Sequence, residues 1–155
     1  MTADQDLLIR DAEGRDAERI AAFNMALARE TEDRELDAGR VLRGVRRVLA
    51  GGAAARYFVA ETRGEVVGQL LITEEWSDWR CGRFWWIQSV FVEPAFRRRG
   101  IFRALYEHVE VRARAGEDIC GLRLYVEGGN REAQATYSRL GMARSGYEVF
   151  EVDWS

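Results

Sequence analysis

Three consecutive arginines, Arg97, Arg98 and Arg99, stand directly before Gly100, between an apolar run and a stretch with helical periodicity. Such a loop leads from a strand into a helix. The N–H groups and dipole of a helix start attract an anion, and arginine adds charge-assisted hydrogen bonds to phosphate. Gly100 also lets the backbone approach a ligand closely. The segment therefore predicts a phosphate-type anion site, with a solvated basic surface beside a helix start as the alternative.

A second strand-to-helix connection lies downstream, where two glycines precede Asn130 and Tyr137 stands two helical turns later. That spacing places both side chains near one face of the helix. Each residue also has a simpler interpretation, because asparagine commonly caps a helix start and tyrosine can be a half-buried core aromatic. Taken separately, neither residue identifies a function.

Together the two connections read R-x-x-G and, later, N-x-x-A-x-x-x-Y-x-x-x-G. This ordered pair of motifs resembles the GNAT superfamily of acetyl-CoA-dependent N-acetyltransferases. The resemblance extends from about Tyr57 to Tyr147, and over the first 50 residues it is only topological. The matching positions are Arg97, Gly100, Asn130, Ala133, Tyr137 and Gly141.

The resemblance implies a role for each matching segment, with acetyl-CoA as co-substrate, no metal, and direct transfer to an amine in a ternary complex. The strand before the loop would offer its main chain to the pantetheine arm, and the loop N–H groups would surround the pyrophosphate. Asn130 would contact the pantetheine region, and Tyr137 would act as general acid near the thioester sulfur. The predicted donor-binding residues are Val90, Phe91, Val92, Arg97, Arg98, Arg99, Gly100, Ile101, Phe102, Arg103, Asn130 and Tyr137.

Two positions depart from the family pattern. Gly or Ala usually stands where this chain has Phe102, whose ring must point into the core if the loop is to keep its geometry. Some family members that act on small amines carry a Glu on the central strand where this chain has Gln88. Glutamine cannot usefully accept a proton near neutral pH, so another group must help to deprotonate the acceptor.

Deprotonating an amine of pKa about 10.4 costs roughly 4.6 kcal/mol at pH 7. Glu74, Glu75 and Asp78 follow the third expected strand, near the acceptor end, and could act directly or through water. We select Glu75 as the catalytic base, and a hydrated loop of charges is the alternative.

The segment from Glu74 to Trp86 also holds four tryptophans among acidic residues, and this combination suits a cation. In GNAT proteins this region and the connection between the first two helices commonly shape the acceptor site. We therefore expect a small cationic amine, such as a polyamine or an amino acid derivative. The alternative is that Trp85 and Trp86 pack in a core or at a dimer face. The helix connection contributes Glu30, Glu32, Asp33 and Glu35.

The expected elements form an α/β (α+β) fold, a mixed and mostly antiparallel sheet with helices on both faces, in a single domain over residues 1–155. Helices are predicted over residues 16–30 (capped by Asp16), 41–49, 101–109 and 130–140. Strands are predicted over residues 7–10, 57–61, 65–73, 85–92, 122–126 and 147–154.

Composition excludes several classes of protein. All 23 basic residues are arginines, and 26 acidic residues bring the net charge to −3, which argues against nucleic-acid binding. No apolar run is long enough to span a membrane and the N-terminus lacks a signal-peptide pattern, so a cytoplasmic protein is expected. Cys81 and Cys120 are isolated and His108 is the only histidine, so neither a disulfide nor a metal site is predicted.

The sequence thus predicts an N-acetyltransferase that moves acetyl from acetyl-CoA directly to a primary amine. The alternatives are a protein or peptide N-acetyltransferase and a non-catalytic acyl-CoA-binding sensor with the same fold. Thiol release from CoA with a panel of amines distinguishes them, and assembly into a homodimer is left open.

Overall fold

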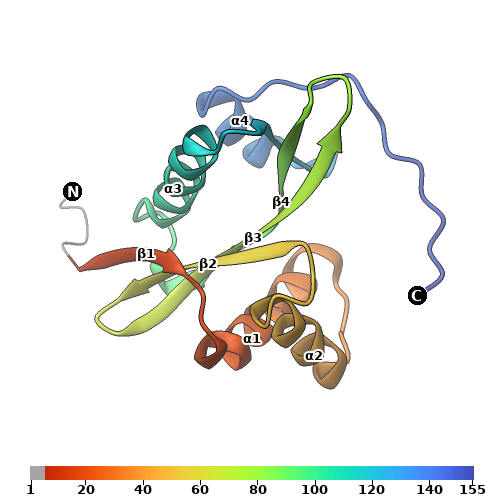
Figure 1. Cartoon of the computed structure of the whole chain (residues 1–155). Coiled ribbons are helices and arrows are strands. Elements are labelled where there is room, and N and C mark those ends of the chain that lie inside the picture. Colours follow the sequence, from red (N-terminus) through yellow and green to blue (C-terminus); the bar gives the residue numbers. More distant parts are fainter. Residues whose placement is uncertain (1–5) are drawn as a thin grey trace. The chain divides into compact units, whose positions relative to one another are not determined.

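The structure of the protein is a computed structural model, which describes residues 6–155. The chain forms two compact units, the first ending at Leu124 and the second running from Tyr125 to Ser155 (Figure 1). The expectation of a single domain over the whole chain stays a prediction.

The first unit is built on a sheet that has five strands in the described part of the chain, arranged in chain order from edge to edge. Antiparallel pairing joins the first four strands, and β4 and β5 run parallel. The expectation of a mixed, mostly antiparallel sheet is confirmed. The strands are β1 (Leu7–Asp11), β2 (Ala55–Thr62), β3 (Glu65–Ser77), β4 (Gly82–Val92) and β5 (Ile119–Leu124).

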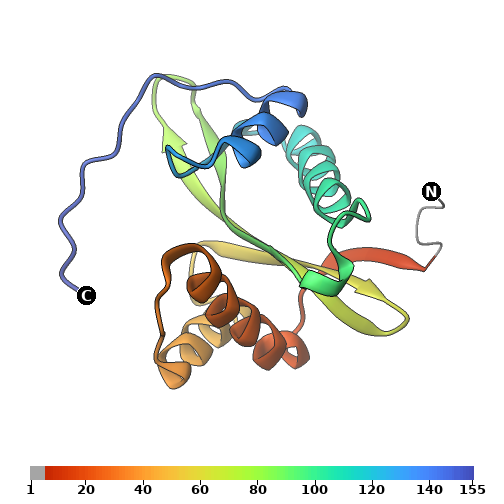
Figure 2. The same ribbon diagram turned by 180° about the vertical axis from the view of Figure 1, so that it is seen from behind.

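Helices cover both faces of this sheet, as predicted (Figures 1 and 2). Tyr57 and Val59 on β2 point to the face on which α1 and α2 pack, where they join a buried apolar cluster. Phe58 points to the opposite face, as strand alternation requires, and its ring lies 5.3 Å from that of His108 on α3. The helices of this unit are α1 (Ala17–Glu32), α2 (Ala38–Leu49) and α3 (Ile101–Ala115), with 3-10 turns at Gly14–Asp16 and Pro94–Phe96.

The β3–β4 hairpin is longer than the sequence suggested. Pairing between these strands continues as far as Ser77 and Gly82, so Glu74 and Glu75 lie within β3 and not after it. The expectation that these two carboxylates belong to a loop was therefore wrong, because the cross-strand ladder extends past the apolar part of the strand.

Asp16 stands at the start of α1 as expected, but its side chain does not cap the helix. The carboxylate accepts hydrogen bonds from the Arg10 guanidinium at 2.8 and 3.0 Å and from the Glu13 amide at 2.7 Å. Burial opposes the charged form of Asp16, but these hydrogen bonds outweigh it and lower the pKa of the carboxyl group. Asp16 thereby ties the start of α1 to β1.

The second unit contains α4 (Arg131–Arg139) and an extended C-terminal segment. Gly141 ends the helix region with a left-handed backbone conformation, φ 91°. The strand predicted over residues 147–154 is absent from the described structure, so this expectation was wrong. The alternation suits a strand, but a strand needs a neighbouring strand to pair with, and the second unit contains none in its described residues.

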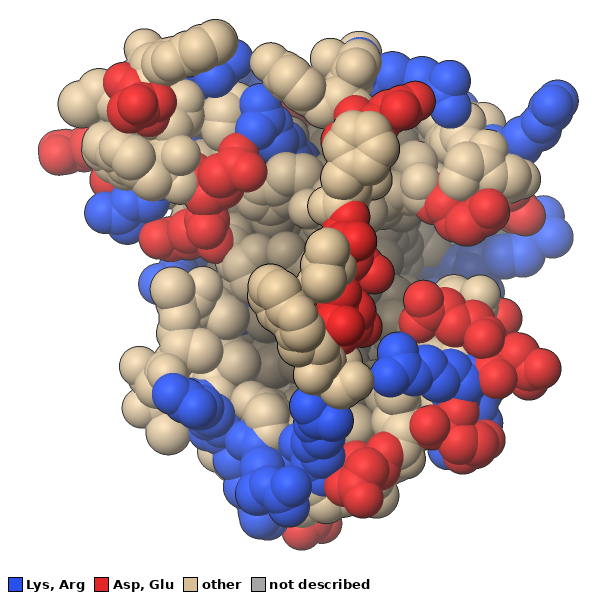
Figure 3. All heavy atoms as spheres, turned by 90° about the vertical axis from the view of Figure 1, so that its right-hand side faces the viewer, with Lys and Arg blue, Asp and Glu red and all other residues tan. Residues whose placement is uncertain are grey.

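Among residues 6–155, no helix combines the length and the apolar character that crossing a membrane requires. The same residues contain no group of three or more His, Cys, Asp or Glu side chains placed to hold a metal ion. On the face shown in Figure 3, arginine and acidic side chains border one another and do not form a continuous basic surface.

Candidate active site

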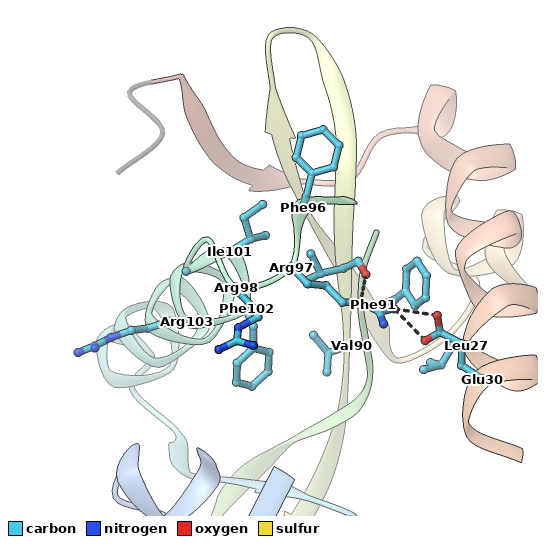
Figure 4. A pocket seen from close by; sticks show the side chains of 12 residues that line it. Leu27, Glu30, Val90, Phe91, Phe96, Arg97, Arg98, Ile101, Phe102 and Arg103 are labelled. Carbon is cyan, nitrogen blue, oxygen red and sulfur yellow. Dashed lines mark hydrogen bonds and ion pairs between the residues drawn. The ribbon is translucent and has the colours of Figure 1, made fainter. Parts of the chain in front are cut away.

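A pocket of about 440 Å³ opens in the first unit between α1, the end of β4 and the start of α3 (Figure 4). Most of its wall comes from two segments that are adjacent in sequence, the last residues of β4 and the loop that leads into α3. The lining residues are Leu27, Glu30, Val90, Phe91, Val92, Phe96, Arg97, Arg98, Gly100, Ile101, Phe102 and Arg103.

The loop before α3 has the backbone geometry of an anion site. Gly100 occupies the N-cap position with φ 80°, and Arg98 also has a left-handed backbone, φ 64°. The first backbone hydrogen bond of the helix is donated by the Ala104 amide to the Gly100 carbonyl at 3.0 Å. The N–H groups that precede this bond point out of the helix end, where they favour an anion.

The last part of β4 has one side of its main chain available to a ligand. Its ladder with β5 ends at Ile87, although β4 continues to Val92. A bulge at Gln88 separates these two halves, since Leu71 of β3 pairs with Ser89 and the next residue, Ile72, pairs with Ile87. The three residues predicted to offer their main chain to pantetheine, Val90, Phe91 and Val92, all lie beyond the bulge and line the pocket.

The three arginines of the loop have different environments. Arg97 is held in place, because its Nε donates to the Val92 carbonyl at 2.8 Å and its Nη2 donates to both carboxylate oxygens of Glu30, at 3.0 and 2.8 Å. Arg99 lies over the ring of Phe96 and is not part of the pocket wall. Arg98 lines the pocket without an ion pair to any described residue, so its guanidinium is the one best placed to meet an added anion.

The first side chains of α3 lie in different environments, some in the core and some at the pocket. Ile101 is buried in the core. Phe102 is half-buried and lines the pocket, so its ring is not fully taken up by the core as the sequence argument required. Arg103 pairs with Glu107 one turn along the helix, N–O 2.8 Å. The family's usual small residue at position 102 is thus replaced by an aromatic wall.

Glu75, the predicted base, is part of a charged cluster on the sheet. Its carboxylate accepts a hydrogen bond from Arg123 of β5 at 2.5 Å, and the same guanidinium lies 3.7 Å from the ring centre of Phe84. Alternation along β3 places Glu75 on the same face as Gln69 and Leu71, the face covered by α1 and α2. Sequence reasoning missed the Arg123 partner, because the two residues are 48 positions apart.

The tryptophans near Glu75 are spread over different environments. Trp76 follows Glu75 directly in β3, so its side chain points to the opposite face of the sheet. Trp79 is exposed in the hairpin turn, whereas Trp85 is buried in β4. Glu75 and Trp76 therefore lie on opposite faces of β3, and the expectation that this segment binds a cation stays a prediction. The alternative of core packing is confirmed for Trp85.

Two neutral glutamines, Gln88 on β4 and Gln69 on β3, make side-chain hydrogen bonds in the sheet. Gln88 Nε2 donates to Thr73 Oγ1 at 2.8 Å, so it bonds to the β3 strand and not to a charged group. Gln69 is fully buried beneath α1 and donates to Asn24 Oδ1 at 3.0 Å, while Asn24 donates to the Tyr57 hydroxyl at 3.2 Å. Nothing in the local sequence pattern indicated this chain of hydrogen bonds.

In the second unit, Asn130 has the simpler of its two predicted roles. Its Oδ1 accepts a hydrogen bond from the Ala133 amide at 3.1 Å and so caps α4. Tyr137 lies near the end of the same helix and is half-buried. Burial raises the pKa of the Tyr137 hydroxyl above its usual value, so this group is protonated at neutral pH.

Comparison with known proteins adds independent findings. The model of the acetyltransferase (GNAT) family matches residues 9–142. A search of curated proteins found no match. Among solved structures, a possible acetyltransferase from Clostridium difficile 630 is 42% identical with a TM-score of 0.90, and the match covers 96% of this chain and 98% of that chain.

Two further structures share the fold at low identity. The ribosomal-protein-alanine N-acetyltransferase from Brucella melitensis biovar Abortus 2308 is 17% identical with a TM-score of 0.77, over 96% of this chain and 99% of that one. The aminoglycoside N-acetyltransferase AAC(6')-Iy, in complex with CoA, is also 17% identical with a TM-score of 0.77, over 96% and 95% of the two chains. At this identity the likeness concerns the fold alone.

Proposed function

Since the chain belongs to the GNAT family of acetyltransferases and is therefore an acyltransferase, we propose that it moves acetyl from acetyl-CoA directly to a small cationic primary amine. The observation that carries this proposal is the pocket in the first unit. One wall is a helix start with Arg98, which suits the diphosphate of acetyl-CoA. The opposite wall contains a carboxylate, Glu30, which suits an amine.

For the donor, the proposal assigns two kinds of backbone group. The N–H groups at the start of α3 bind the diphosphate, aided by the Arg98 guanidinium. The main chain of Val90, Phe91 and Val92, which lies beyond the last rung shared with β5, binds the pantetheine arm. Gly100 supports both roles, because its left-handed φ shapes the loop and no side chain shields the amides.

For the reaction, we assign Tyr137 as general acid. The acceptor nitrogen forms the new C–N bond to the acetyl carbonyl carbon, and the C–S bond breaks. The Tyr137 hydroxyl donates its proton to the departing sulfur. A thiol has a pKa near 8.5, so this help is useful but not obligatory.

For the acceptor, two carboxylates support a preference for cations. Glu30 holds the Arg97 guanidinium and Glu75 holds the Arg123 guanidinium, both through short ion pairs. Each carboxylate is 41–44% exposed, so an ammonium group can reach it. We assign Glu75 as the group that removes the acceptor's proton, directly or through a water molecule, with Arg123 orienting the carboxylate.

The deciding experiment measures thiol release from acetyl-CoA with polyamines, amino acids, aminoglycosides and peptides in parallel. We expect turnover with cationic small amines and weaker turnover with neutral or anionic ones. A clear preference for an acidic acceptor would overturn the acceptor assignment, and a preference for peptides would favour the protein-acetylating alternative. Binding of CoA without turnover of any amine would favour the sensor, the role that Gln88 in place of a carboxylate supports.

A further inference from the structure

One ion pair joins opposite walls of the pocket. Arg97 belongs to the loop before α3 and Glu30 lies near the end of α1, 67 positions away, and both line the pocket. Arg97 Nη2 donates to both carboxylate oxygens of Glu30, at 3.0 and 2.8 Å, and Figure 4 shows the side chain extending from the loop toward α1. Both side chains are partly exposed, so an added charge can reach either one.

Two other contacts hold Arg97 to the last part of β4. Its Nε donates to the Val92 carbonyl at 2.8 Å, and its guanidinium carbon lies 5.3 Å from the ring centre of Phe91, where a cation is attracted to the ring. Both of these partners belong to β4 and neither involves Glu30. Arg97 can therefore release Glu30 and still remain at the pocket wall.

The pair stands between the charges that the two substrates carry under the proposed function, on which this inference rests. The diphosphate of acetyl-CoA at the start of α3 attracts the neighbouring Arg97, and an ammonium group attracts Glu30. Either ligand alone draws away one member of the pair and leaves the other without its partner. When both ligands are bound, each member has a new partner of opposite charge.

We propose that the Arg97–Glu30 ion pair couples the two substrates, so that each ligand tightens the binding of the other. The coupling is reciprocal, because both factors belong to the same thermodynamic cycle. The cost of opening the pair sets its size, and an exposed ion pair changes an equilibrium by about 1.5- to 5-fold. Arg97 is thus a positioning residue, which lowers the affinity of Glu30 for a cation while the donor is absent.

A second ion pair joins the same parts of the chain and supplies a matched control. Arg19 of α1 pairs with Glu93, which follows β4, at 2.8 Å, and these side chains are also partly exposed. Neither Arg19 nor Glu93 is part of the pocket wall. Removing this pair takes away a tie between α1 and the end of β4 and leaves the charges of the pocket unchanged.

The first test uses CoA, which carries no acetyl group, so that its ternary complex with an amine cannot react. Isothermal titration calorimetry of the full chain at constant ionic strength measures the Kd of CoA with and without putrescine, and the Kd of putrescine with and without CoA. We expect each ligand to lower the Kd of the other by about 1.5- to 5-fold, and by equal factors. Affinities that do not depend on the other ligand, or that weaken, would overturn the coupling.

Thiol release from acetyl-CoA with putrescine, measured in parallel, separates this inference from the proposed function. Turnover without coupling overturns the role of the ion pair and leaves the transfer reaction standing. Coupling without turnover of any amine supports the ion pair and overturns the transfer reaction.

The second test is Arg97→Gln, which distinguishes coupling from a merely structural role. Glu30 then lacks its arginine, so putrescine alone should bind about 1.5- to 5-fold more tightly than it binds the unmodified protein. CoA should no longer change that affinity. A structural role predicts instead that both ligands bind more weakly, and this result would contradict the proposal.

Two control variants accompany Arg97→Gln. Arg98→Gln also removes a positive charge from the pocket wall, but Arg98 does not pair with Glu30, so the coupling factor should be retained. Glu93→Gln removes the second ion pair and should retain the coupling as well. If Arg98→Gln raises the affinity for putrescine as much as Arg97→Gln does, or if Glu93→Gln abolishes the coupling, the assignment to the Arg97–Glu30 pair is wrong.

Discussion

The donor wall and the acceptor carboxylates of the first unit differ in how the chain builds them. The proposed donor wall is one continuous segment, residues 90–103, and the roles we assign to it belong mainly to backbone groups. The proposed acceptor carboxylates come from separate elements, Glu30 from α1 and Glu75 from β3. Glu30 already holds Arg97 of the donor wall, and Glu75 holds Arg123 of β5.

This difference concerns the kind of ligand that each side can hold. The N-cap residue of α3 is Gly100, which has no side chain to cap the helix, so the backbone N–H groups of this wall are open to an anion. A cationic acceptor must instead compete with Arg97 or Arg123 for its carboxylate. The proposed function thus combines an uncapped helix start on the donor side with carboxylates on the acceptor side that exchange an arginine for the amine.

The largest expected effect tests the donor wall. Gly100→Val places a β-branched side chain at φ 80°, which strains the loop and covers the amides. Acetyl-CoA at a hundred times its Kd should raise the Tm of the unmodified protein by about 5–10 °C, and Gly100→Val should lose nearly all of that shift. Thermal melts with and without acetyl-CoA measure it.

The matched control is Gly64→Val, in the β2–β3 turn, where φ is 78° and a side chain likewise meets no neighbouring atom. It should carry a similar backbone strain but keep the ligand-induced shift. If Gly100→Val binds acetyl-CoA as well as Gly64→Val does, the loop is not the phosphate site.

Removing the hydroxyl of Tyr137 is expected to have the next largest effect. Tyr137→Phe keeps the ring and should lower kcat by roughly 10- to 1,000-fold, in the range of general acid catalysis, with little change in CoA affinity. Because burial raises the pKa of the Tyr137 hydroxyl above its usual value, the group is protonated at neutral pH and can act as an acid there. Tyr125→Phe is the control and should keep its turnover. Unchanged turnover in Tyr137→Phe, with chemistry limiting the rate, would contradict the role of Tyr137 as general acid.

The acceptor side is tested by comparing two adjacent carboxylates. Glu75→Gln should lower kcat/KM for a cationic amine by roughly 10- to 100-fold, since both proton removal and charge pairing weaken. Glu74→Gln is the control, because Glu74 points to the other face of β3 and pairs with Arg83. Steady-state kinetics at several pH values checks both, and equal losses in the two variants would mean that only the overall charge matters.

The smallest expected effect tests whether Asn130 only caps α4 or also binds the donor. Asn130→Ala should lower the free energy of unfolding by about 0.5–2 kcal/mol, since the Ala133 amide loses its acceptor. Asn130→Asp keeps a capping oxygen and should restore stability. Denaturant melts and CoA titrations on both variants decide the role, and a loss of CoA affinity in Asn130→Asp with stability intact would show that the amide itself binds the donor.

The sequence by itself determined the features that depend on neighbouring residues. The strand, the arginine loop, Gly100 and the following helix were all predicted, because strand alternation, helical spacing and glycine conformation act over a few residues. The same holds for the cap at Asn130 and the end of α4 near Gly141. The family pattern could be identified for this reason, since its motifs lie within such local segments.

Tertiary structure alone decided which charged groups pair with each other. It also decided whether a segment with an alternating pattern forms a strand. Arg97 meets Glu30 across 67 positions and Arg123 meets Glu75 across 48, and these pairs depend on which elements pack together. The length of the β3–β4 ladder and the bulge at Gln88 follow from pairing between strands. Residues 147–154 show the same limit most clearly, because alternation defines the two faces of a strand, but only a neighbouring strand supplies the hydrogen bonds that form it.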